Sequence, residues 1–145
     1  MSTASGAPIG TLWQILALHY LLAAVPVPRS GRQITFEEIP EARGYSGPYT
    51  GRVLKLFCAT VGRSRDSLLA AARNLQAEIV PGGDLAVRLR VFPQVPLTVA
   101  WYEGDEELPP GAAFVYQDNI TALLDVEDIV VMAERVVSRL RGKPW

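Results

Sequence analysis

Residues 92–118 constrain the fold of this chain more than any other segment. Residues 97–102 and 113–116 are two short apolar runs whose alternation and aromatic content are typical of β-strands. Between them lie four carboxylates within five residues, 103–107, followed by a diproline. Turn-forming residues between two such runs predict that the runs are neighbouring strands of an antiparallel sheet.

The rest of the chain predicts helices before and after this sheet. Apolar residues at helical spacing follow Thr11, Ser64 and Asp125, each of which is a good N-cap, and a further helix is predicted over about residues 50–61. The strands are predicted over residues 34–39, 85–91, 97–102 and 113–116. The fold class is therefore α+β, an antiparallel β-meander of about four strands packed against N-terminal helices and a C-terminal helix.

Length and composition exclude several classes of protein. The chain has 145 residues, which predicts one domain over residues 11–142 after a flexible tail at residues 1–10. Its net charge is −1 with no basic block, which argues against nucleic acid or an anionic membrane as a partner. The apolar run 15–27 is too short to span a bilayer, and a cytoplasmic location is expected. The single cysteine, Cys58, excludes an intramolecular disulfide.

The acidic turn is the first candidate site. Glu103, Asp105 and Glu106 are close enough in sequence to bind a ligand or a cation, or for one of them to act as an acid or base. The turn lacks the alternating ligand spacing of a calcium loop. A solvated turn in a hairpin is the alternative interpretation.

His19 and a tyrosine-containing loop form a second group of candidates. His19 is the sole histidine, and its spacing from Leu12 predicts a place on the apolar face of the first helix. There it would be an axial ligand to haem or a corrinoid, a general base, or a core histidine. Tyr45 and Tyr49 lie in a Gly- and Pro-rich segment, residues 40–50, which is predicted to be a loop and a place for binding residues.

Arg88 and Arg90 share one face of a predicted strand and have the chemistry to clamp a carboxylate or a phosphate. Arginines of an exposed sheet face that pair with acids such as Glu103 are the alternative. Trp101 is a candidate for stacking on a planar ligand, and packing in the core is the alternative interpretation.

Several short segments, taken in order, resemble the domain-of-unknown-function family numbered 3786. They lie at residues 18–22, 34–39, 83–87, 93–97, 101–110 and 124–128, and the resemblance covers about residues 12–141. It implies a cytoplasmic protein of anaerobic bacteria or archaea, accessory to cofactor or one-carbon metabolism. Some members of the family carry an additional iron–sulfur domain, which this cysteine-poor chain lacks. The resemblance implies no established activity and no catalytic residues.

These observations favour a non-catalytic binding or accessory module. We expect it to recognise a small molecule, a cofactor such as a corrinoid or another tetrapyrrole, or a partner protein. The expected site residues are His19, Tyr45, Tyr49, Arg88, Arg90, Trp101, Glu103, Asp105 and Glu106. One alternative is a small enzyme that uses Asp105 or Glu106 with His19. Another is a structural subunit of an assembly, including a homo-oligomer, which predicts an apolar surface patch.

Overall fold

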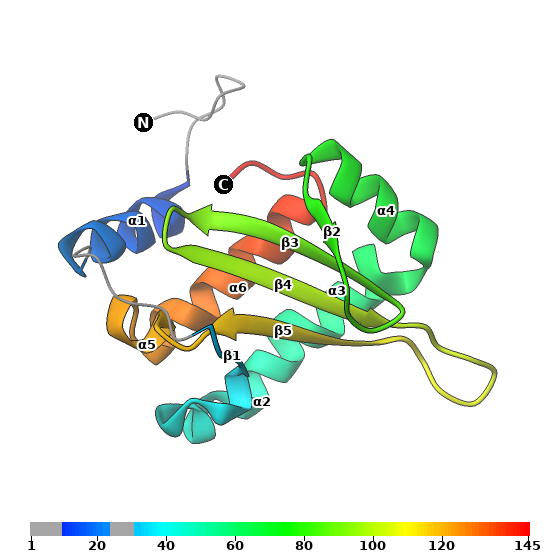
Figure 1. Cartoon of the computed structure of the whole chain (residues 1–145), viewed down its shortest axis with the longest axis horizontal. Helices are drawn as coiled ribbons and strands as arrows, with labels where there is room; N and C mark the ends of the chain where they lie inside the picture. The colour runs from blue at the N-terminus through cyan, green and yellow to red at the C-terminus, as the bar shows by residue number, and fades with distance from the viewer. Residues whose placement is uncertain (1–9, 24–30) are drawn as a thin grey trace.

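A five-stranded antiparallel sheet is the centre of the fold (Figure 1). The computed structural model describes residues 10–23 and 31–145. Within them the strand order is β1-β5-β4-β3-β2, and every neighbouring pair is antiparallel. The strands are β1 (Gln33–Thr35), β2 (Glu78–Val80), β3 (Leu85–Phe92), β4 (Val95–Tyr102) and β5 (Gly111–Gln117). The α+β class predicted from the sequence is confirmed.

Helices pack on one face of this sheet, with α6 running behind the strands and α3 beside it (Figure 1). The α-helices are α1 (Thr11–Ala23), α2 (Ser46–Tyr49), α3 (Leu56–Ala59), α4 (Arg65–Asn74), α5 (Ile120–Leu123) and α6 (Val126–Leu140). Shorter helical segments of the 3-10 type are Phe36–Glu38, Pro40–Tyr45 and Val61–Arg63, and Thr50–Lys55 is a π-helix.

Alternation along the strands decides which side chains enter the core. Val87, Val99 and Phe114 are paired across β3, β4 and β5, and all three are buried. Phe57 of α3 packs edge-on against Phe114, with ring centroids 5.7 Å apart. The buried row therefore faces the helices, because a strand directs successive side chains to opposite faces.

The predicted caps of α4 and α6 are confirmed. The Ser64 side chain accepts a hydrogen bond from the Ser67 amide, and the Asp125 carboxylate accepts one from the Asp128 amide. Each interaction satisfies one of the free N–H groups at a helix start. The buried stripe of α6 includes Ile129, where the side chain has no exposure.

Three local predictions are wrong. Residues 40–50 are helical rather than a loop, and β1 ends at Thr35, where a 3-10 helix replaces the rest of the predicted strand. The apolar residues at helical spacing after Ser64 continue as far as Ile79 and so predict a longer helix, but α4 ends at Asn74. Gln76 then adopts a positive φ of 54°, which turns the chain into the edge strand β2. Pairing with β3 overrides the helical spacing of the apolar residues there.

An aromatic stack attaches α1 to the end of β3. Phe92 lies between Trp13 and Tyr20, with ring centroids 4.9 and 4.4 Å away and interplanar angles of 6° and 10°. Trp145 continues the stack on Trp13 at 4.4 Å. The buried side of α1 therefore contains Trp13, Leu16 and Tyr20. The side chain of His19, predicted on the inward face, is about half exposed, so that prediction is wrong.

In the described part of the chain, no helix combines the length and the apolar character that crossing a membrane requires. Residues 1–10, predicted to be a flexible tail, lie almost wholly outside the described residues.

Candidate functional site

An open hollow of about 480 Å³ lies where the exposed edge of β3 extends past β2. Arg88 and Arg90 of β3 and Arg139 of α6 are among the residues that line it. The wall is completed by Asn74, Leu75, Gln76, Ala77, Leu89 and Trp145. We call this site the arginine hollow. It contains two of the arginines that the sequence indicated and a third from a distant element.

Each of the three guanidinium groups donates one hydrogen bond within the protein. Arg88 Nε donates to Thr98 Oγ1 over 3.3 Å, and Arg90 Nη1 donates to the Pro93 carbonyl over 2.7 Å. Arg139 Nη1 donates to the Lys143 carbonyl over 3.4 Å. A guanidinium has five N–H donors, so most of the donors of Arg90 and Arg139 remain for a ligand.

Carboxylates only weakly compensate the positive charge of the arginine hollow. Arg88 Nη1 lies 3.9 Å from Glu78 Oε2, at the long limit of an ion pair, and both side chains are partly exposed. Among the described residues, Arg90 and Arg139 form no ion pair with a carboxylate. Three cations with one distant anion create a positive potential that suits a phosphate or a carboxylate.

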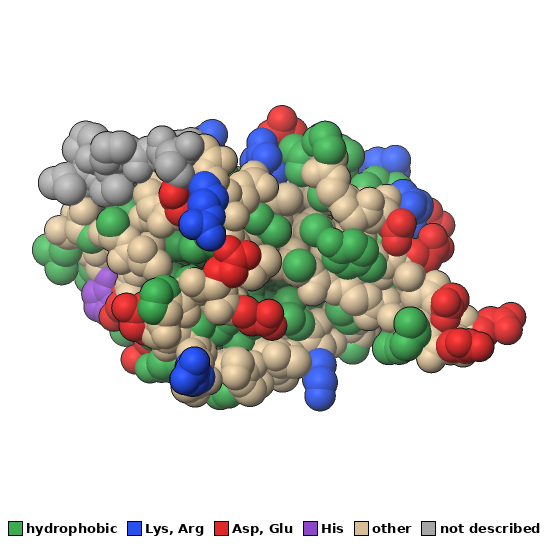
Figure 2. All heavy atoms as spheres, turned by 60° about the horizontal axis from the view of Figure 1, so that its bottom comes forward, with side chains coloured by type: hydrophobic (Ala, Val, Ile, Leu, Met, Phe, Trp, Pro, Cys, Tyr) green, Lys and Arg blue, Asp and Glu red, His purple; other side chains and the backbone are tan. Residues whose placement is uncertain are grey.

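The acidic turn is a hairpin turn held by its own hydrogen bonds, and it lies at one end of the molecule (Figure 2). The Asp105 carboxylate accepts hydrogen bonds from the Glu107 and Leu108 amides, each at 2.8 Å. These amide hydrogen bonds hold the pKa of Asp105 below its ordinary value. Its lone pairs stabilise the turn itself. The backbone of Glu103 is also held in place, since its amide donates a hydrogen bond to the Asp84 carboxylate. Glu106 is exposed.

Trp101 lies at the base of this turn. Its Nε1 donates to the buried Gly62 carbonyl over 2.7 Å, and the Arg65 guanidinium lies 5.9 Å from the ring centroid. Trp101, Glu103 and Asp105 line an open cleft of about 290 Å³ that also contains Arg63 and Arg65. Its charges are mixed, so it has no clear preference for an anion or a cation.

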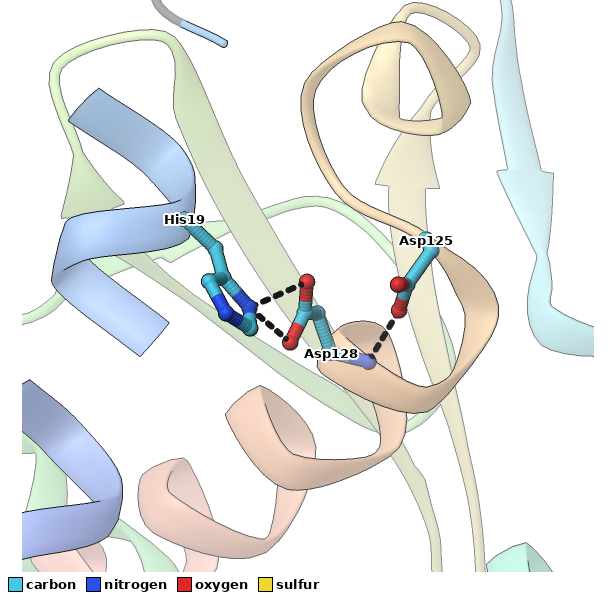
Figure 3. A network of polar contacts seen from close by, with 3 residues as sticks. All are labelled: His19, Asp125 and Asp128. Atoms are coloured by element: carbon cyan, nitrogen blue, oxygen red, sulfur yellow. Dashed lines mark hydrogen bonds and ion pairs between the residues drawn. The ribbon is translucent and has the colours of Figure 1, made fainter. Parts of the chain in front are cut away.

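His19 belongs to a different site. Its Nδ1 lies 2.8 and 3.0 Å from the two carboxylate oxygens of Asp128, next to the Asp125 cap of α6 (Figure 3). Hydrogen bonding and charge attraction from Asp128 raise the pKa of His19. The imidazole lies at the end of the molecule opposite the acidic turn (Figure 2). The structure therefore separates His19 from Asp105 and Glu106.

The tyrosine candidates are part of the core. The Tyr49 hydroxyl lies 2.9 Å from the Tyr116 hydroxyl, and the Tyr49 ring stacks on Phe36 with centroids 3.9 Å apart. Burial raises the pKa of Tyr49 and of Tyr116 well above the ordinary tyrosine value. Tyr45 is half-buried against the same core. Neither Tyr45 nor Tyr49 lines the arginine hollow or the acidic-turn cleft.

The predicted site residues thus occupy four separate places. The structure brings Arg88 and Arg90 together, and it brings Trp101 together with the acidic turn. Sequence reasoning missed Arg139 and Trp145 as site residues. Arg139 attracted attention only as a cation near the end of α6, and no local pattern links it to β3.

Metal and thiol chemistry have little support in the described residues. Among residues 10–23 and 31–145, no group of three or more His, Cys, Asp or Glu side chains is arranged to hold a metal ion. The Cys58 thiol is half-buried, and burial raises its pKa, which disfavours the reactive thiolate.

The structure is that of an α+β domain with a small open hollow whose lining includes three arginines. The chain belongs to the family described as Domain of unknown function (DUF3786), whose model matches residues 2–139. A search of curated proteins and a search of solved structures each found no match.

Proposed function

We propose that this protein is a non-catalytic binding module whose arginine hollow holds a small molecule or cofactor through a carboxylate or phosphate group. The observation that carries the proposal is the presence of three arginines, Arg88, Arg90 and Arg139, in the lining of one hollow with a single distant carboxylate partner. Guanidinium groups bind planar and tetrahedral oxyanions through paired N–H donors, which gives geometric selection as well as charge.

The shape of the hollow supports a ligand of modest size. A volume of about 480 Å³ is within the ordinary range for small-molecule sites. Leu75, Leu89 and Trp145 provide an apolar wall beside the arginines. A ligand with an apolar or planar body and an anionic substituent would use both surfaces. A corrinoid or another tetrapyrrole meets that description if its anionic side groups enter the hollow.

The family resemblance suggests the setting for this activity. We propose that the module serves an accessory role in cofactor or one-carbon metabolism in the cytoplasm of an anaerobe. The enzyme alternative has no geometric support, because His19 pairs with Asp128 and lies far from the acidic turn. The assembly alternative concerns another surface, the exposed side of α1.

Calorimetric titration of the whole chain tests the proposal. The probes are inorganic pyrophosphate, a carboxylated porphyrin and cobalamin, each at low and at physiological salt. We expect at least one probe to bind, with affinity that falls as salt rises. Replacement of Arg90 or Arg139 by Gln should weaken that binding about tenfold or more, because each removes a charge-assisted contact.

Two controls sharpen the result. Arg43→Gln removes the same charge from an exposed residue outside the hollow and should leave affinity within about twofold. Arg90→Lys keeps the charge but loses the planar donor pair, so it should bind more weakly than the unchanged protein. Absence of binding by all three probes would overturn the proposal. An equal loss in Arg43→Gln would also overturn it, because nonspecific charge would then explain the binding.

A further inference from the structure

The outer side of α1 is an exposed apolar surface, and this surface has no part in the arginine hollow. Five large aliphatic side chains of this short helix are between 45% and 86% exposed. They are Leu12, Ile15, Leu18, Leu21 and Leu22, and we call them the α1 face. Such a concentration of exposed aliphatics is typical of an interaction site.

Fixed packing on the other side of α1 determines which residues are exposed. Trp13 and Tyr20 stack on Phe92, and the Tyr20 hydroxyl accepts a hydrogen bond from the Gln94 amide over 3.3 Å. Next to Tyr20 in the helix, His19 pairs with Asp128. These contacts hold α1 in one orientation, so the α1 face is presented as a pre-formed surface that needs no ordering on binding.

The spacing along the α1 face fits a second helix. Ile15, Leu18 and Leu22 are separated by three and then four residues, which is the spacing of one apolar seam in a helix pair. Leu12 and Leu21 flank this seam. A partner helix with the same spacing would interdigitate with it.

Charge favours a second copy of the same helix. Residues 11–23 contain no Asp, Glu, Lys or Arg, and the charge of His19 is matched by Asp128, so two copies meet without like-charge repulsion. The absence of Lys and Arg also disfavours docking on an anionic lipid surface, for which interfacial helices use basic side chains. Self-complementarity is the property that a two-fold interface requires.

The area is at the lower limit for a specific interface. Five aliphatic side chains with these exposures form a patch on the order of 500 Å², so a symmetric pair buries at most roughly 1,000 Å² in total. A weak, reversible dimer is therefore expected.

We propose that the α1 face binds the α1 face of a second copy of this chain, with the two helices antiparallel about a two-fold axis. Leu18 is close to the middle of α1, so it lies near the axis beside the partner's Leu18. Ile15 then lies toward the partner's Leu22. The proposal does not rest on ligand binding at the arginine hollow.

Sedimentation equilibrium of the whole chain between about 1 µM and about 1 mM tests this proposal. We expect the average mass to rise from that of a monomer toward that of a dimer. Leu18→Glu should raise the dissociation constant about tenfold or more, because two like charges would face each other near the axis. Leu108→Glu places the same charge on another exposed leucine, in the acidic turn, and should leave association unchanged.

A mixed sample identifies the geometry. Leu18→Glu and Leu18→Lys chains should each be monomeric alone and should form a heterodimer when mixed, because opposite charges then meet at the axis. Near-ultraviolet circular dichroism of the aromatic stack verifies that each variant is folded. A monomer at all concentrations overturns the proposal, and so does unchanged association in Leu18→Glu. Monomeric protein that floats with phosphatidylcholine vesicles also overturns it, since the α1 face would then bind lipid.

Discussion

The imidazole of His19 donates from Nδ1 to the Asp128 carboxylate, and this ion pair joins α1 to the first turn of α6 (Figure 3). The two residues are 109 positions apart in sequence. Asp128 is also favourably placed near the positive end of the α6 dipole, and its amide bonds to the Asp125 cap. One contact therefore links the first and the last α-helix of the described chain.

This pair predicts a defined pH dependence of stability. The pKa of His19 is raised above 6.5 in the folded chain, so protonation stabilises the fold. The contribution is complete below pH 6.5 and is lost as the pH rises through the folded-state pKa. We expect His19→Gln to lower the free energy of unfolding more at pH 5.5 than at pH 8.5, measured by urea denaturation.

Nuclear magnetic resonance gives a direct check, because His19 is the sole histidine. Its titration should show a pKa above 6.5, and Asp128→Asn should shift that pKa back toward 6.5. A titration midpoint at or below 6.5 in the unchanged protein would contradict the ion pair.

The buried tyrosine pair predicts strong energetic coupling. Tyr49→Phe leaves the Tyr116 hydroxyl buried without its partner, which should cost about 1–3 kcal/mol of unfolding free energy. Tyr116→Phe should cost a similar amount. The double variant should lose less than the sum, because it leaves no unpaired hydroxyl. Chemical denaturation of all four proteins measures the coupling, and strict additivity would argue against the hydrogen bond.

Close packing in the acidic turn predicts intolerance of a methyl group at Gly104. A Cβ there would lie 2.6 Å from the Leu108 carbonyl oxygen and 2.6 Å from the Pro110 nitrogen, both backbone atoms. Gly104→Ala should therefore destabilise the protein by about 1–3 kcal/mol and increase proteolysis of the turn. Gly111→Ala is the matched control, since a Cβ at Gly111 meets nothing within 4 Å. Equal stability of the two variants would show that the turn has a different backbone.

Asp105 predicts a second pH effect, at the acid end. Its pKa is lowered by the Leu108 and Glu107 amides, so the stabilisation is present above pH 3.8 and is lost as the pH falls through the lowered pKa. A titration of the carboxyl groups, monitored by nuclear magnetic resonance, should give Asp105 a pKa below 3.8. Replacement by Ala should abolish protection of the Glu107 and Leu108 amides from hydrogen exchange at neutral pH, whereas Glu106→Ala should leave it unchanged.

Local sequence signals predicted the helix starts and the strands that depend on interactions between residues close together in the sequence. Ser64 and Asp125 were recognised as caps because their side chains bond to amides only three residues later. The strands on either side of the acidic turn were recognised from alternation, because a period of two is intrinsic to a strand. The same information supported the family resemblance, which the match over residues 2–139 confirms.

Long-range packing decided the rest. α1 is apolar on nearly every side, so its periodicity does not distinguish the buried side from the exposed one, and stacking of Trp13 and Tyr20 on Phe92 makes that choice. The sequence by itself determined an α+β fold, its caps and its acidic turn. Only the tertiary structure gathered Arg88, Arg90 and Arg139 into one hollow and paired His19 with Asp128. These groups lie on elements far apart in the chain, and no local pattern encodes their meeting.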